Sequence, residues 1–212
     1  MSSRNTHEKI LDAARTCLER FGVRRTTLSD IAREAGLSRP TVYRHWPDID
    51  SLLADLLTRE MRRVFAAADP GTPADGPGTG TPEAGTPGAG RRNGREVLLA
   101  EAASVIGTLR EHPLFTRILA TEPEVLATYT FQRLGASQLS ALELLEQRIA
   151  DGQGDGSIRP GDPAALARMV LLVAQGAVTS WRLADDVLPG EKLTAEVIRL
   201  LDAYLRPEGA PR

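Results

Sequence analysis

The sequence is poor in the residues on which metal proteins and secreted proteins depend. Cys17 is its single cysteine, and it has three histidines among 212 residues. One cysteine cannot form an internal disulfide, and no group of Cys and His is spaced to hold a metal ion. These shortages indicate a protein of the cytoplasm, where thiols stay reduced, and we expect neither a metal nor another cofactor.

Long apolar runs are also missing. No stretch approaches the roughly 20 apolar residues of a membrane-spanning helix, and the N-terminus leads directly into an amphipathic pattern. We therefore expect no signal peptide, no anchor and no membrane partner. Aromatic residues make up only 4% of the chain, which argues against a pocket specialised for stacking many flat cations.

Catalytic motifs are absent as well. The sequence contains no nucleophile elbow, no zinc-binding His-Glu-x-x-His, no phosphate-binding glycine loop ending in Lys and no dinucleotide fingerprint. Of the histidines, His7 lies near the N-terminus, and His112, directly before Pro113, is expected on the surface. The sequence does not predict an enzyme.

The distribution of charge divides the chain into two parts. The formal net charge is -2 overall, but residues 1–65 hold 12 Lys and Arg against 9 Asp and Glu, a net of +3. The remainder holds 14 against 19, a net of -5. A basic N-terminal part suits a partner with a phosphate backbone, although an excess of three is modest.

Helical periodicity runs through the N-terminal part. Apolar residues at steps of three and four predict a helix at about 6–21 that buries Cys17. Thr27 is placed to cap a short second helix, and Gly36 to end it in a tight turn. Ser38 is placed to cap a third helix, and a longer fourth helix is predicted from Asp48 onward.

The rest of the chain reads as one low-complexity segment followed by helices. Residues 69–94 are dominated by Pro, Gly, Thr and Ala, and predict a flexible connector. Helical patterns then follow at about 95–110, 113–121, 123–151, 163–187 and 193–205. Because no alternating strand pattern occurs anywhere, the predicted fold class is all-α.

The strongest motif lies between the second and third predicted helices. A helix-turn-helix needs a small residue at its sharp turn, an apolar residue joining the helices and short polar side chains opening the second helix. Gly36, Leu37 and the run Ser38-Arg39-Pro40-Thr41 meet these needs in order. The continuous stretch from Thr27 to Pro47, extended to Leu53, closely resembles the DNA-binding domain of the TetR (tetracycline repressor) family.

The resemblance implies a set of contacts to double-stranded DNA. Thr27 would present its hydroxyl and backbone N–H to a phosphate. Arg39 and Arg44 would read guanine, while Tyr43 and His45 would reach phosphates. The recognition helix would be lined by Ser38, Arg39, Pro40, Thr41, Tyr43, Arg44 and His45. The alternative is that both arginines are solvated surface charges and that Tyr43 is a packing residue.

Two further positions bear on this resemblance. Trp46 stands where the family usually has an aromatic residue that packs the small domain, so we expect it in the core. Ile49 stands where similar proteins often have a lysine that contacts the DNA backbone. The loss of one cation should flatten the salt dependence of binding by about one counterion.

For the remainder, the resemblance implies a helical bundle that binds an effector and dimerises. The implied domains are a three-helix helix-turn-helix domain at 1–66, a linker at 67–94, an effector-binding and dimerisation domain at 95–206, and a tail at 207–212. The last two helices would pair with those of a second subunit. The segment at 163–187 is apolar around much of its circumference, and Gly176 and Ala177 would permit close approach. The alternative is a core helix buried within one chain.

Candidate pocket residues are bulky or polar side chains on otherwise apolar helices, although for each of them ordinary packing is an open alternative. They are Phe115, Ile118, Tyr129, Phe131, Gln132, Met169, Gln175 and Trp181. The composition does not identify the small-molecule effector.

One loop resembles a metal site in part. Residues 151–162 have acids at the first, fifth and twelfth positions of a calcium loop and glycine at the sixth. Gln153 and Asp162 break the pattern at the third and twelfth positions, so a plain interhelical turn is the favoured interpretation.

Together these features predict a ligand-released repressor that acts as a homodimer on a palindromic operator. The rival interpretation is a helical ligand-binding or scaffold protein with weak DNA binding. Activation in place of repression stays open.

Overall fold

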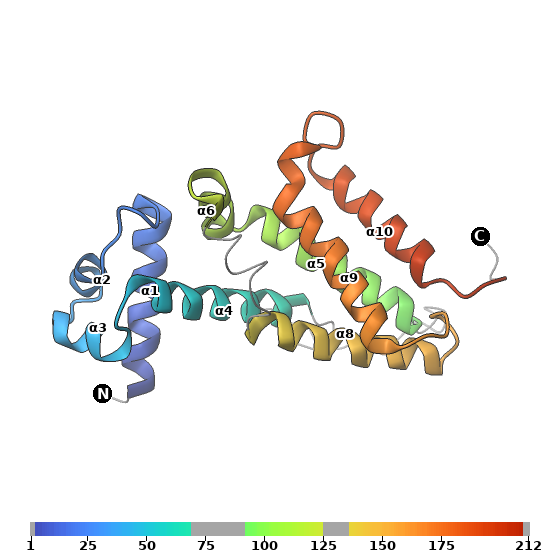
Figure 1. The fold of residues 1–212 in the computed structure, drawn as a ribbon, viewed down its shortest axis with the longest axis horizontal. Coiled ribbons are helices and arrows are strands. Elements are labelled where there is room, and N and C mark those ends of the chain that lie inside the picture. Colours follow the sequence, from blue (N-terminus) through green and yellow to red (C-terminus); the bar gives the residue numbers. More distant parts are fainter. Residues whose placement is uncertain (1–2, 69–91, 125–135, 210–212) are drawn as a thin grey trace, which may run out of the picture. The chain divides into compact units, whose positions relative to one another are not determined.

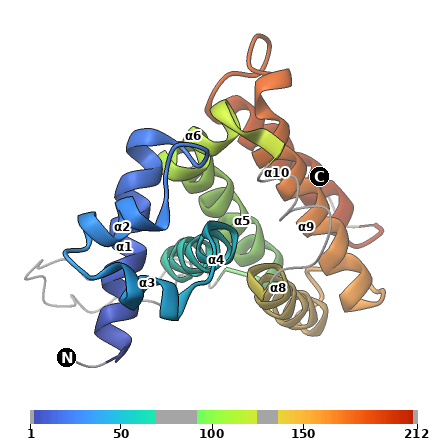
Figure 2. The ribbon, with the colours of Figure 1, turned by 60° about the vertical axis from the view of Figure 1, so that its left-hand side comes forward.

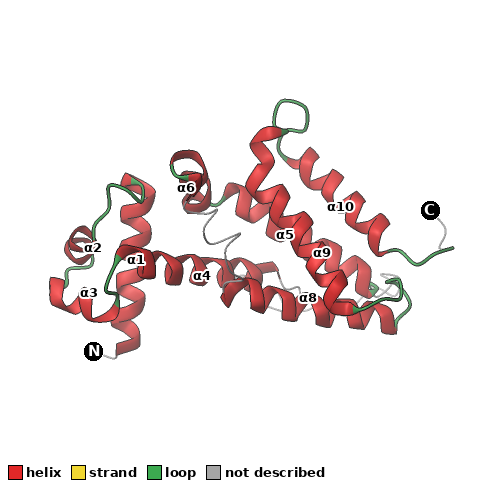
Figure 3. Cartoon of the chain, in the orientation of Figure 1, coloured by secondary structure: helices red, strands yellow, loops and turns green. Residues whose placement is uncertain are grey.

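The computed structural model describes residues 3–68, 92–124 and 136–209, and these are helical with no β-strand among them (Figure 3). The all-α prediction is confirmed. The elements are α1 (Ser3–Phe21), α2 (Leu28–Glu34), α3 (Arg39–His45), α4 (Ile49–Ala68), α5 (Gly94–Glu111), α6 (Pro113–Thr121), α8 (Ala136–Gly154), α9 (Pro163–Ser180) and α10 (Glu191–Leu205).

Contacts group the chain into two compact units. The first unit comprises the described parts of Met1–Val64 and Thr108–Leu139, and the second those of Phe65–Gly107 and Ser140–Arg212. Helix α6 therefore belongs with α1, α2, α3 and most of α4. The predicted connector falls mostly on residues 69–91, which lie outside the described residues.

The core of the first unit follows from the apolar period of α1. Ile10, Ala14 and Leu18 are completely buried, and Cys17 lies among them with 2% of its surface exposed. Burial raises the pKa of the Cys17 thiol. Helices α1, α2 and α3 pack together as a small group (Figures 1 and 2), and the expected burial of Cys17 is confirmed.

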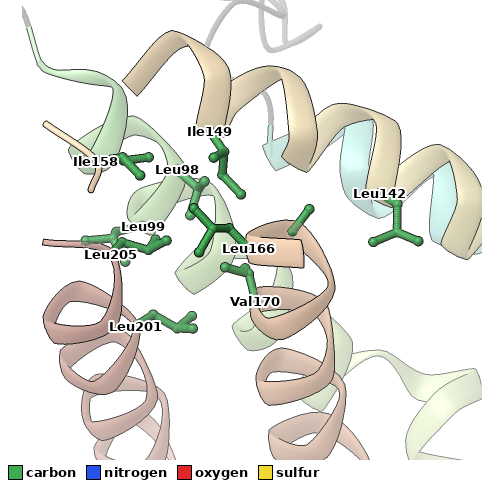
Figure 4. Close-up of a cluster of buried hydrophobic side chains, with 10 residues drawn as sticks. Leu98, Leu99, Leu142, Ile149, Ile158, Leu166, Val170, Leu201 and Leu205 are labelled. Carbon is green, nitrogen blue, oxygen red and sulfur yellow. The ribbon is translucent and has the colours of Figure 1, made fainter. Parts of the chain in front are cut away.

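The second unit is built from α5, α8, α9 and α10 around one apolar cluster (Figure 4). Its buried members are Leu98, Leu99, Leu142, Ile149, Ile158, Leu166, Ala167, Val170, Leu201 and Leu205. The first residue of α5 lies against the last turn of α8, and this close approach requires that Gly94 has no side chain. A Cβ on Gly94 would lie 2.6 Å from the Cα of Gly152.

Arg159 binds the C-terminal end of α10. The backbone N–H of Arg159 donates to the carbonyl of Leu205 at 2.8 Å, and its Nε donates to the carbonyl of Tyr204 at 2.8 Å. Its guanidinium also lies 4.6 Å from the centre of the Tyr204 ring. These contacts satisfy carbonyls at the C-terminal end of α10, which have no partner within the helix.

The helix predicted at 163–187 is shorter than expected. Helix α9 ends at Ser180 and is followed by a single 3₁₀ turn, Trp181–Leu183. The apolar pattern continues beyond this point, but Leu183 and Val187 are 86% and 69% exposed, so no packing supports a longer helix. The helix predicted at 123–151 is described only as α8, since residues 125–135 lie outside the described residues.

Helix α9 is more apolar than predicted, since no stretch of the sequence is expected to approach a membrane-spanning helix. By length and composition alone, Pro163–Leu183 could cross a membrane, and only 22% of its most apolar window is buried within the chain. Met169 and Leu172 of α9 are 43% and 62% exposed.

Candidate nucleic-acid interface

The turn between α2 and α3 has the geometry that the sequence predicts. Gly36 has a φ of +60°, in the left-handed region that favours glycine. The N–H of Leu37 donates to the carbonyl of Ala32 at 2.9 Å, and that of Gly36 donates to Arg33 at 3.1 Å. These bonds satisfy the last carbonyls of α2 and reverse the chain within a few residues.

The N-terminus of α2 is closed by a reciprocal capping box. The Thr27 hydroxyl accepts the Asp30 N–H at 3.2 Å, and the Asp30 carboxylate accepts both the Thr27 N–H at 3.1 Å and the Thr27 hydroxyl at 2.6 Å. The bonds from Thr27, aided by Arg33, lower the pKa of Asp30. The predicted cap is confirmed, and the Asp30 carboxylate accepts from both donors of Thr27, its N–H and its hydroxyl.

Helix α3 separates into a buried and an exposed face. Ser38 caps it, with its hydroxyl accepting the Thr41 N–H at 3.4 Å and lying 2.8 Å from the Thr41 hydroxyl. Val42 is completely buried, while Tyr43 is 50% exposed. The exposed positions form two adjacent rows spaced by four residues, one of Arg39 and Tyr43 and one of Pro40 and Arg44.

The C-terminal end of α3 is fixed by an aromatic cluster. Trp46 is 3% exposed, and its Nε1 donates to Asp55 Oδ2 on α4 at 2.9 Å. The rings of His7 and His45 lie 4.5 Å and 5.6 Å from the Trp46 ring. The core role expected of Trp46 is confirmed, and His45 is half-buried, packed against α1 as well as facing outward.

An ion cluster with a buried centre, Arg59 and Glu60, connects α4 to α1. Arg59 contacts Asp12 at 2.8 Å, Glu8 at 3.1 Å and Glu60 at 2.8 Å. Glu60 is 1% exposed. Burial acts to raise its pKa, but the contact with His112 and the contacts with neighbouring arginines outweigh burial and lower it to about 2.

The position of His112 corrects the sequence-based expectation. His112 Nε2 lies 3.6 Å from Glu60 Oε2, and its side chain is 12% exposed, so the residue is not on the surface. Pro113 begins α6, as predicted, but α6 packs within the first unit and carries His112 inward. Sequence spacing did offer a signal for Glu60, which lies four residues after Leu56 and four before Val64 on the buried stripe of α4.

The structure brings only some of the candidate pocket residues together. Phe115 and Ile118 are both buried on α6, one turn apart. Met169 on α9 is 43% exposed, and Gln175 and Trp181 are half-buried. The others, Tyr129, Phe131 and Gln132, lie outside the described residues.

The loop at 151–162 serves the fold. Asp155 accepts the backbone N–H of Gly94 at 2.6 Å and that of Ser157 at 2.9 Å, while Asp162 accepts the N–H of Ala164 at 3.2 Å and caps α9. Among the described residues, no group of three or more His, Cys, Asp or Glu is arranged to hold a metal ion.

Comparisons with known proteins agree with this geometry. Residues 10–56 match the family model described as "Bacterial regulatory proteins, tetR family". The chain is 36% identical over 201 residues to an uncharacterized HTH-type transcriptional regulator of Mycobacterium tuberculosis, Rv2250c, with 95% of each chain covered.

Solved structures show the same fold at low identity. The chain is similar to the regulator FadR from Bacillus subtilis in complex with stearoyl-CoA, with a TM-score of 0.65, 18% identity and coverage of 94% and 99% of the two chains. It is also similar to a SmeT–triclosan complex, with a TM-score of 0.63, 22% identity and coverage of 97% and 93%. SmeT is a repressor of a Stenotrophomonas maltophilia multidrug efflux pump.

Proposed function

The chain belongs to the TetR family of HTH-type transcriptional regulators, and from this premise we propose that it is a ligand-released repressor that binds a palindromic DNA operator as a homodimer. The observation that carries the proposal is the exposed face of α3, where Arg39 and Arg44 project from a helix fixed by caps and a buried Trp46. A rigid helix that presents two arginines suits the major groove, because arginine pairs bidentately with guanine.

The contacts to DNA divide by the groups that make them. Arg39 and Arg44 read bases, Thr27, Tyr43 and His45 reach phosphates, and Ser38, Pro40 and Thr41 line the same recognition helix in the major groove. At the N-terminus of α2, the helix dipole and the first N–H groups favour a phosphate next to Thr27. Arg33 accompanies Asp30 at 2.8 Å, which offsets the negative charge near that phosphate.

Dimerisation is supported by the uncovered stripe on α9. Ala165, Met169, Leu172 and Gly176 are exposed and recur at the spacing of one helix face, while Leu166 and Val170 on the other face enter the core. Leu172 is 62% exposed, and Leu200 on the adjacent helix α10 is 54% exposed. A second copy of this surface would bury the α9 stripe and Leu200, and a two-fold dimer would set its two recognition helices about 34–36 Å apart on DNA.

Release by a small molecule is the regulatory part of the proposal. FadR and SmeT, which have similar folds, have been solved with stearoyl-CoA and triclosan. Phe115 and Ile118 in the first unit, and Gln175 and Trp181 in the second, stay pocket candidates among the described residues, whereas Met169 belongs to the proposed dimer stripe. An effector can release DNA only by its differential affinity for the two states of the dimer. We propose that the chain binds DNA in the cytoplasm and that it has no catalytic role.

The test is a binding selection against random duplex DNA. We compare the purified wild-type protein with Arg39→Ala/Arg44→Ala, and use Arg182→Ala/Arg199→Ala as a control that removes the same charge from exposed positions of the second unit. Circular dichroism and sedimentation confirm that all three proteins are folded and in the same oligomeric state.

Recovery of a palindromic site by the wild type and the control, but not by Arg39→Ala/Arg44→Ala, is the expected result. If all three proteins recover the same site, Arg39 and Arg44 do not read the bases. If none enriches any site, the rival function gains support, namely a helical ligand-binding or scaffold protein whose DNA binding is weak.

A further inference from the structure

Glu122, at the C-terminal end of α6, is a buried carboxylate that plays no part in the contacts proposed above. It is 4% exposed. Its Oε1 and Oε2 accept the backbone N–H of Arg24 at 3.1 and 3.0 Å. Arg24 lies 98 residues earlier, in the loop between α1 and α2. One side chain of α6 thus holds the backbone that leads into the helix-turn-helix.

The loop is tightly folded around this contact. Gly22 ends α1 with a φ of +82°, and a Cβ at that position would lie 3.0 Å from Glu122 Oε1. Thr26 is 4% exposed, and its hydroxyl donates to the carbonyl of Gly22 at 2.7 Å. The N–H of Thr26 also donates to the carbonyl of Val23 at 3.1 Å. These bonds tie Thr26 back to the end of α1.

The surroundings of Glu122 disfavour a carboxylate, so this side chain lowers the stability of the fold in part. It is itself the C-cap of α6, and it lies against the residue that ends α1. The C-termini of helices carry partial negative charge, and burial further disfavours a carboxylate. The bond from Arg24 is a charge-assisted one, which is stronger than a neutral bond and offsets part of this cost.

The loop ends at the proposed phosphate contact. Thr27, which caps α2, follows Arg24 by three residues, and Thr26 between them is buried and bonded. We infer that Glu122 is a positioning residue for DNA binding: by holding the Arg24 N–H it fixes the loop that sets the N-terminus of α2 against a phosphate. This inference rests on the proposed function, and it links the end of α6 to the DNA contact through one side chain.

The first experiment measures DNA affinity for Glu122→Ala, Glu122→Gln and the control Glu124→Ala. The probe is the duplex that the wild type recovers from random DNA. Glu124 is a neighbouring carboxylate that is 54% exposed and contacts the Arg24 side chain at 2.5 Å, so its removal deletes the same charge and spares the backbone bond.

We expect Glu122→Ala to bind about tenfold more weakly, from the loss of one charge-assisted bond. Glu124→Ala should stay within about twofold, because exposed ion pairs contribute little. Glu122→Gln, whose amide oxygen can still accept the N–H, should recover most of the affinity.

A double-mutant cycle separates positioning from a general loss of structure. If Glu122 acts through Thr27, then Glu122→Ala should weaken binding about tenfold in the wild-type background and less than about twofold in a Thr27→Ala background. Hydrogen exchange of the free protein should show faster exchange of the amides at 22–28 in Glu122→Ala, with α4 and the second unit unchanged.

Each outcome is decisive. Equal DNA affinity of Glu122→Ala and the wild type overturns the inference, and so does a full tenfold loss in the Thr27→Ala background. Unchanged exchange at 22–28 also overturns it, whether or not DNA binds. If the wild type recovers no DNA site, the proposed function fails and this inference fails with it, whereas a wild type that binds DNA beside an unaffected Glu122→Ala refutes the inference alone.

Discussion

Replacing Glu60 by glutamine tests how much the buried Glu60 carboxylate stabilises the first unit. Glu60 is 1% exposed and has Arg59, Arg63, Arg15 and His112 within 3.6 Å of its carboxylate. Its pKa falls from 4.5 to about 2. Each pKa unit corresponds to about 1.4 kcal/mol, so ionised Glu60 should contribute about 3 kcal/mol to folding at neutral pH.

The sign of the pH dependence follows from the direction of this shift. The pKa of Glu60 is lower in the folded state, so its contribution is complete above about pH 4.5 and is lost as the pH falls towards 2. Glu60→Gln cannot ionise and should lack this contribution at every pH. The free energies of unfolding of the two proteins should therefore differ by about 3 kcal/mol at pH 7 and converge on acidification.

The assay is urea unfolding followed by tryptophan fluorescence. The chain has two tryptophans, and a Trp181→Phe background leaves Trp46, 3% exposed, as the reporter of the first unit. Glu19→Gln is the control, since Glu19 pairs with Arg15 at 2.8 Å on the helix surface and should cost under about 0.5 kcal/mol. A difference below about 0.5 kcal/mol for Glu60→Gln at pH 7, or one that does not change with pH, would refute the reasoning.

Three other perturbations have defined outcomes. Thr27→Ala removes the cap that accepts the Asp30 N–H and should lower the free energy of unfolding of the first unit by about 1 kcal/mol. In a filter-binding titration it should weaken binding to specific and non-specific DNA alike. A loss confined to specific DNA would contradict the phosphate role of Thr27. Leu172→Glu, at a 62% exposed position, should give a monomer of unchanged helix content by sedimentation, and a persistent dimer would place the interface elsewhere. Asp162→Ala removes the side chain that caps α9 by accepting the Ala164 N–H, and should lower the free energy of unfolding by about 1 kcal/mol in thermal unfolding. The DNA affinity of this variant should equal that of the wild type, and a change in it would contradict the prediction.

Much of the fold could be predicted from the sequence because its signals are local. The cap at Thr27, the turn at Gly36 and the cap at Ser38 each depend on residues within four positions, and the structure has all three. The buried stripe of α1 follows in the same way from its period. Local hydrogen bonding and side-chain spacing are enough to place these elements.

The contacts that could not be predicted join residues far apart in the chain. His112 approaches Glu60 across 52 positions, and Glu122 accepts from Arg24 across 98. Nothing in the flanking residues specifies either pairing, and a histidine before a proline gives no local sign of burial. The end of α9 at Ser180 is a related case, because the apolar pattern continues to Val187 but no neighbour covers it.

The burial of Cys17 has a practical consequence for measuring how this protein changes shape. A thiol that is 2% exposed and whose pKa is raised by burial reacts slowly with maleimides and methanethiosulfonates. The native chain should therefore carry little background label, and a cysteine introduced at one exposed position, such as Arg25, could be labelled alone. In a symmetric dimer, one such substitution yields a pair of spin labels, and the distance between them would report directly on the separation of the DNA-binding heads as candidate effectors are added.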